Sequence, residues 1–115
     1  MSMRTLYCLA LITLIFLSGC TTPPKIDASL ATQECIKLCE NALKEGRDLS
    51  NGPCLSDNNP SWTVENWVCD VAHSPRQQID NQRENQCNEW WESYQKGSPL
   101  NFVEVTPSCK FIKTG

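Results

Sequence analysis

The sequence predicts a small, disulfide-rich α+β domain in which two helices pack against a short antiparallel sheet of two or three strands. Three features support this fold class. Six cysteines lie within residues 35–109, two segments repeat apolar residues at helical spacing, and short segments show the alternation and β-branched residues of strands. A domain of this size buries a limited core, so we expect disulfides to contribute much of its stability.

The first expected helix covers residues 31–45. Asp27 or Ser29 is suited to cap its start, and Gly46 is suited to end it. Cys35 and Cys39 are one turn apart and face the same way, so each is expected to bond another segment rather than its neighbour. The apolar stripe of this helix consists of Ala31, Cys35, Leu38, Cys39, Ala42 and Leu43.

A loop and a strand are expected next. Residues 47–61 contain Asn-Gly-Pro and Asn-Pro turn signals and should form the loop. In the strand at 67–72, Val68 and Asp70 alternate with a second set of residues that should face the core. That second set consists of Trp67, Cys69 and Val71.

The second helix is expected over residues 87–96, with an apolar stripe that contains Cys87, Trp90, Trp91 and Tyr94. Short strands at 102–105 and 110–112 should follow it. Adjacent helical residues point about 100° apart, so one of the two neighbouring indoles is expected at the surface.

Cysteine usage predicts disulfides rather than a metal centre. A zinc site usually needs Cys-x2-Cys or His-x3-His units, whereas this chain has Cys35-x3-Cys39 and a single histidine, His73. That spacing also differs from the Cys-x2-Cys of thiol oxidoreductases. We therefore expect no metal and no cofactor. The bridging residues should be Cys35, Cys39, Cys54, Cys69, Cys87 and Cys109.

The pairing of the six cysteines is open, because they allow 15 connectivities. The chain that leaves the first helix can easily return to it within the eight residues that precede Cys54. This reach favours a Cys39–Cys54 bridge.

The first twenty residues have the order of a secretory leader. Arg4 supplies a positive charge, residues 6–17 are apolar, and a Leu-Ser-Gly-Cys motif occupies 17–20. This segment resembles the lipobox signal peptide of prokaryotic lipoproteins. The resemblance implies cleavage after Gly19 and a lipid anchor on Cys20. Thr21 stands where an aspartate would signal inner-membrane retention, which favours the outer membrane if the host has one.

The chain thus divides into a signal peptide at 1–19, a lipidated cysteine with a flexible tether at 20–30, and a cysteine-rich domain at 31–115. Loss of Arg4 with the leader would leave a net charge of −4, from nine basic and 13 acidic residues. An acidic chain argues against nucleic acid as a partner. The expected membrane contact is the lipid anchor, in an extracytoplasmic location in the cell envelope.

A polar segment after the first strand is the candidate for catalysis. Asp70 could orient His73 as a general base, and Glu104 could lie on an adjacent strand. Arg76 could bind a carboxylate or phosphate. In the simpler interpretation, Asp70 and His73 hydrogen-bond the turn, while Arg76 pairs with Asp80 at the surface.

Tryptophan content favours binding. An exposed tryptophan is enriched at binding hot spots and stacks on sugar faces, and the candidates here are Trp62, Trp90 and Trp91, with Arg76 as a polar contact. The simpler interpretation is that these rings cover the disulfides.

Several short segments resemble those of small secreted cysteine-rich prokaryotic domains that are uncharacterised. They are Gly-Pro-Cys-Leu at 52–55, Cys-Asp-Val-Ala-His-Ser-Pro-Arg at 69–76, Asn-Gln-Cys at 85–87 and Phe-Val-Glu-Val at 102–105. This resemblance implies no activity. The leading interpretation is an envelope protein that binds a partner, such as another envelope protein or peptidoglycan. The alternatives are a small hydrolase that uses Asp70, His73 and Glu104, and a structural assembly factor.

Overall fold

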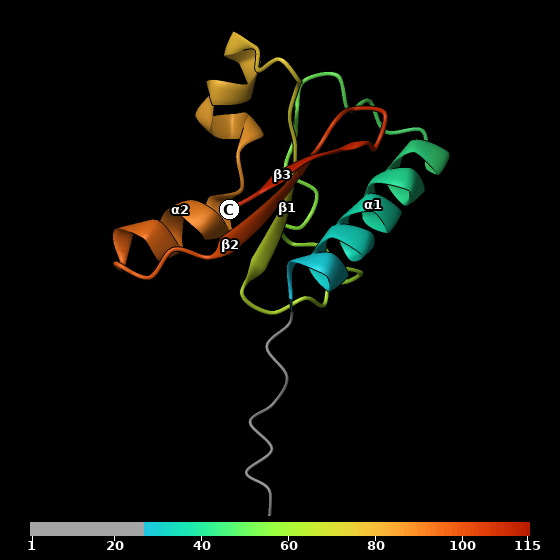
Figure 1. Cartoon of the computed structure of the whole chain (residues 1–115). Helices are drawn as coiled ribbons and strands as arrows, with labels where there is room; N and C mark the ends of the chain where they lie inside the picture. Colours follow the sequence, from blue (N-terminus) through green and yellow to red (C-terminus); the bar gives the residue numbers. More distant parts are fainter. Residues whose placement is uncertain (1–26) are drawn as a thin grey trace, which may run out of the picture.

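The computed structural model describes residues 27–115 as two α-helices, two short 3-10 helices and a three-stranded sheet (Figure 1). Helix α1 spans Ala28–Lys44 and helix α2 spans Asn88–Gln95. The strands are β1 (Trp67–Val71), β2 (Asn101–Val105) and β3 (Phe111–Thr114). The leader, the lipobox with Cys20 and most of the expected tether lie outside the described residues. Three disulfides hold these elements together, which confirms a disulfide-rich α+β domain.

The sheet is mixed, so the expectation of an antiparallel sheet is wrong. Strand β2 is central: it pairs with β1 in parallel and with β3 in antiparallel orientation. The reason lies in the connection. The segment between β1 and β2 carries α2, and a parallel pair needs such a long crossover, whereas a tight turn suffices between β2 and β3.

Helix α1 begins where its sequence provides a cap. The Asp27 side chain accepts a hydrogen bond from Leu30 N at 3.0 Å, as the capping preference of aspartate predicts. The expected stripe is buried except at its last member, Leu43, which is exposed. This buried side packs on the sheet face formed by Trp67, Cys69, Val71, Val103 and Val105.

Two disulfides fasten α1 to the sheet. Cys35 bonds Cys69 on β1, and Cys39 bonds Cys109 in the turn before β3. The expectation that each helical cysteine bonds another segment is therefore confirmed. The expected Cys39–Cys54 bridge is wrong, because α1 lies against the strands and places Cys39 beside the β2–β3 turn, while Cys54 reaches the opposite face and bonds Cys87.

On the opposite side of the sheet, α2 lines a groove together with β1 and β2. The 3-10 helices Gln78–Asn81 and Arg83–Asn85 lie between β1 and α2 in the chain. In Figure 1, α1 and α2 lie on opposite sides of the sheet. The alternation of β1 decides which residues face each side: Val68 and Asp70 face α2, and their neighbours face α1. Among residues 27–115, neither α-helix combines the length and the apolar character that a membrane crossing requires.

Candidate functional site

A groove of about 210 Å³ lies between the sheet and α2. Strand β1 contributes Val68 and Asp70 to it, and strand β2 contributes Phe102 and Glu104. These four side chains share one face because Val68 is aligned with Phe102 and Asp70 with Glu104 in the parallel register. The remaining lining residues are Arg76, Gln86, Cys87, Trp90 and Trp91.

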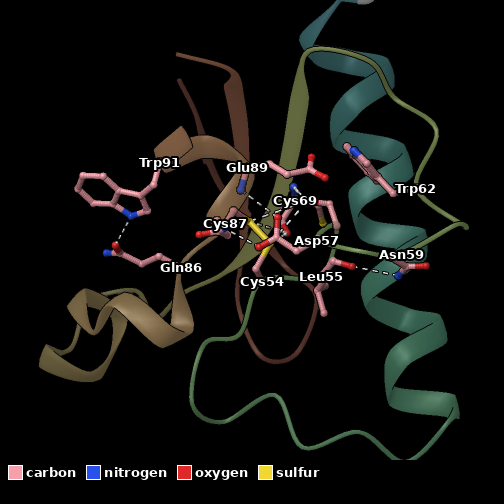
Figure 2. Close-up of a disulfide and its surroundings, with 12 residues drawn as sticks. Cys54, Leu55, Asp57, Asn59, Trp62, Cys69, Gln86, Cys87, Glu89 and Trp91 are labelled. Carbon is pink, nitrogen blue, oxygen red and sulfur yellow. Dashed lines mark hydrogen bonds between the residues drawn. A yellow bond between two sulfur atoms is a disulfide. The ribbon is translucent and has the colours of Figure 1, made fainter. Parts of the chain in front are cut away.

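The loop that precedes β1 places a disulfide beside Asp70 on the same sheet face. Leu55 N donates to Cys69 O at 2.9 Å and Val71 N donates to Pro53 O at 3.1 Å, so the segment pairs with the free edge of β1. This pairing sets Cys54 opposite Asp70 in an antiparallel bridge. Figure 2 shows the resulting Cys54–Cys87 disulfide among its neighbours. Cys54, Asp70 and Glu104 therefore follow one another across the same sheet face.

Asp70 is the unusual residue of the groove. Its Oδ1 is buried and has no hydrogen-bond partner among residues 27–115. Burial raises the pKa of Asp70 to about 8, and the nearby Glu104 carboxylate adds to the increase, while Arg76 opposes it. At neutral pH the side chain is therefore a carboxylic acid that can donate a hydrogen bond.

Glu104 has a charged partner. Arg76 Nη1 donates to Glu104 Oε1 at 3.1 Å, and the Glu104 side chain is only 10 % exposed. The guanidinium is oriented further by Asn81 Oδ1 at 2.7 Å and by Asp80 O at 3.2 Å. The sheet thus places Asp70, whose Oδ1 has no hydrogen-bond partner within the described part of the chain, next to Glu104, which forms an ion pair.

The aromatic wall of the groove comes from α2. Trp90 and Trp91 are both partly buried and meet edge to face, with ring centroids 5.2 Å apart. One of the two indoles was expected at the surface; instead, both rings are partly exposed and neither is fully exposed. Trp91 Nε1 donates to Gln86 Oε1 at 2.7 Å, as drawn in Figure 2, so this ring is held in place.

His73 does not belong to the groove. Its Nδ1 lies 2.9 Å from Oδ1 of Asp80, so Asp80 rather than Asp70 orients the ring. Asp80 also accepts hydrogen bonds from His73 N and Gln77 N. Burial raises the pKa of Asp80, but these hydrogen bonds together hold it below its ordinary value. Asp80 is buried and organises the loop, contrary to the expected surface pair with Arg76.

Trp62 also lies apart from the two α2 indoles, as Figure 2 shows for Trp62 and Trp91. It lines a second, open depression together with Trp67 and Leu100. Its Nε1 donates to Trp67 O at 2.9 Å. The fold therefore brings together Asp70, Arg76, Glu104 and the two α2 tryptophans, but not His73 or Trp62.

Sequence reasoning missed three residues that line the groove: Val68, Gln86 and Phe102. Phe102 precedes Glu104 by two positions and shares its sheet face, a signal that strand alternation could have supplied. Gln86 is held by hydrogen bonds to Asp80 O and from Trp91 Nε1, residues six positions before it and five after it. No local sequence pattern indicates such contacts.

Comparison with protein-family models, with curated proteins and with solved structures gave no match to this chain.

Proposed function

We propose that the protein is a lipid-anchored protein of the cell envelope and that its domain binds a partner molecule in the groove between the sheet and α2. The disulfides indicate an oxidising, extracytoplasmic location. The observation that carries the binding function is the groove itself: aromatic walls surround a buried carboxyl oxygen of Asp70 that lacks a partner among residues 27–115.

The dimensions and chemistry of the groove limit what it can bind. At about 210 Å³ it is smaller than typical sites for drug-sized molecules, so it fits a single side chain or a single sugar ring of a larger partner. The flat face of such a group can stack on Trp90 or Trp91. A polar atom of the partner can hydrogen-bond the Asp70 carboxyl. A protein segment or a peptidoglycan strand presents groups of this kind.

The binding proposal is tested with single alanine variants of the wall and a remote aromatic control. Peptidoglycan fragments and a library of short peptides are titrated against the protein while tryptophan fluorescence and binding heat are recorded. Trp90→Ala and Trp91→Ala should weaken binding at least about tenfold, as expected for aromatic anchors. Phe111→Ala, which changes an exposed ring on β3, should leave affinity within about twofold. Equal binding by wild type and both tryptophan variants would exclude the groove as the binding site.

The anchor is tested separately in a bacterial host. The full-length chain should fractionate with membranes and carry added lipid mass on a mature N-terminal Cys20. Cys20→Ala should abolish both the lipid mass and the membrane association. Unchanged membrane association of that variant would overturn the lipid-anchor proposal.

A hydrolase is the second candidate, supported by one observation. Asp70 and Glu104 lie in register on adjacent strands, and one is held protonated while the other forms an ion pair with Arg76. Such a division suits a general acid beside a general base. His73 takes no part in this proposed hydrolysis, because it lies outside the groove and pairs with Asp80. Glycan hydrolysis by the wild type, lost in Asp70→Asn and in Glu104→Gln, would support it, and glycans bound but left intact would contradict it.

A further inference from the structure

We propose that Cys54–Cys87 is an exchangeable disulfide that accepts electrons from a client dithiol, with Asp70 supplying the proton to the departing sulfur and the Ser56 hydroxyl hydrogen-bonding that sulfur. This activity is distinct from partner binding, although Cys87 and Asp70 also line the groove in which the partner is proposed to bind.

Two groups lie near this disulfide: the Asp70 carboxyl, which can transfer a proton, and the Ser56 hydroxyl, which can donate a hydrogen bond. One carboxyl oxygen of Asp70 and the two Sγ atoms all lie within 4.8 Å of one another. Ser56 Oγ lies 3.6 Å from Cys54 Sγ and 3.8 Å from Cys87 Sγ. This hydroxyl already accepts a hydrogen bond from Cys69 N at 2.9 Å, so its own proton is free to point toward a sulfur.

In the described part of the chain, no side-chain hydroxyl or carboxyl forms a hydrogen bond with the sulfurs of the other two disulfides. The polar atoms next to the sulfurs of Cys35, Cys39 and Cys69 are backbone carbonyl oxygens, which accept protons in hydrogen bonds but cannot donate them. Both bridges lie in the core between α1 and the sheet, with every cysteine at most 7 % exposed. Within residues 27–115, Cys54 alone of the cysteines is partly exposed.

The exchange proceeds in two balanced steps. The first client thiolate attacks Cys54 Sγ, the bond between the two sulfurs breaks, and Cys87 leaves with the electron pair and takes the Asp70 proton. The second client thiolate then attacks the client sulfur of this mixed disulfide and releases Cys54 as a thiolate, which is protonated by solvent. The client dithiol is oxidised to a disulfide and Cys54–Cys87 is reduced to two thiols.

The protonation of Asp70 suits this role. Its pKa of about 8 lies close to the ordinary value for a thiol, so the acid is protonated at neutral pH and can still release its proton to a thiolate. The aromatic wall beside the bridge gives the client an apolar surface on which to dock. Neither feature is needed for a disulfide that only stabilises the fold.

The experiment follows the reduction of each bridge in the oxidised protein by glutathione, with alkylation of free thiols and peptide mass mapping. We expect Cys54–Cys87 to react at least about tenfold faster than either other bridge, with the glutathione first attached to Cys54. The rate constant per glutathione thiolate should fall as pH rises through about 8, because the acid is then lost. A peptide with two cysteines should then be oxidised in a one-to-one ratio with the protein.

Asp70→Asn should slow this reaction about tenfold at pH 7 and remove the fall with pH, and Ser56→Ala should slow it less. The two core bridges are the internal control, because an Asp70 variant that only loosened the fold would accelerate their reduction as well. Equal reduction rates for the three bridges, or an unchanged pH profile in Asp70→Asn, would overturn the proposal. If Asp70→Asn does not fold, the proposal is still tested by the relative reduction rates of the three disulfides in the wild type and by the pH dependence of its Cys54–Cys87 reduction.

Discussion

Asp70 and Asp80 show how two aspartates of one chain acquire opposite pKa shifts. Asp80 is buried among hydrogen-bond donors, namely two backbone amides and the His73 ring, and these stabilise its charge. Asp70 lies beside Glu104 in a groove with largely apolar walls, and one of its oxygens has no partner among residues 27–115. Burial raises the pKa of both carboxyls, but the hydrogen-bond donors around Asp80 outweigh this effect and keep that carboxylate ionised.

Asp70 should make the stability of the protein fall with increasing pH. Its pKa is about 8 in the folded state and 3.8 in the unfolded state, so between these values the folded protein binds more protons. The contribution of Asp70 to the free energy of unfolding therefore decreases by about 1.4 kcal/mol per pH unit over this window. Because Asp70→Asn cannot ionise, the stability difference between variant and wild type should shift in favour of the variant from pH 5 to pH 8. Denaturant titrations across this range measure the difference.

A stability difference between Asp70→Asn and wild type that stays constant from pH 5 to pH 8 would show that Asp70 ionises normally. Asp48→Asn is the matched control, because Asp48 is exposed and its pKa is lowered by Ser50. Its effect should be small and should not change between pH 5 and pH 8.

The two α-helices differ in where their caps come from. Asp27 is adjacent to α1 and bonds Leu30 N, so that cap is a local feature of the sequence. Cys87 precedes α2 and gives no side-chain cap. Instead, Asp57 accepts hydrogen bonds from Asn88 N at 2.6 Å and from Glu89 N at 3.3 Å. Helix α2, and with it the aromatic wall, therefore depends on a loop that is distant in sequence.

Asp57→Ala should loosen α2 without disturbing α1. Loss of a cap costs about 1 kcal/mol, and two free amides would remain at the start of a helix of only eight residues. We expect faster hydrogen exchange at Asn88 and Glu89. Asp27→Ala is the mirror control and should affect Leu30 in α1 instead. Equal protection of α2 in both variants would show that the Asp57 contacts do not hold the helix.

At the scale of the whole molecule, the disulfides differ in what they connect. Cys39–Cys109 closes the longest loop, with a sequence separation of 70, whereas the other two span 34 and 33 residues. It joins the first helix to the last turn. In the chain-entropy description, the longer loop restricts the unfolded chain more.

Removing Cys39–Cys109 should therefore destabilise the protein most. Replacing both cysteines by alanine is expected to cost about 4 kcal/mol, and the same change at Cys35 and Cys69 about 0.5 kcal/mol less. Denaturant unfolding of the double variants measures these costs, after peptide mapping of the wild type has verified the three pairs. A smaller cost for Cys39–Cys109 than for Cys54–Cys87 would contradict the loop-length argument.

Local patterns in the sequence determined the parts of this protein that depend on neighbouring residues. The helical spacing of apolar residues placed α1 and α2, alternation identified which side of β1 faces the core, and the even cysteine count indicated three bridges. Aspartate beside the first turn predicted the α1 cap. Each of these rests on residues a few positions apart, where chain geometry allows few alternatives.

Only the tertiary structure decided the pairing and the site. The parallel register of β1 and β2 aligned Asp70 with Glu104, and the edge pairing of the preceding loop added Cys54 to the same row. His73 pairs with Asp80 instead of Asp70, because the loop folds around the Asp80 carboxylate. Strand order, cysteine pairing and the burial of Asp70 all depend on contacts between segments distant in sequence, and such contacts leave no periodic signal in the chain.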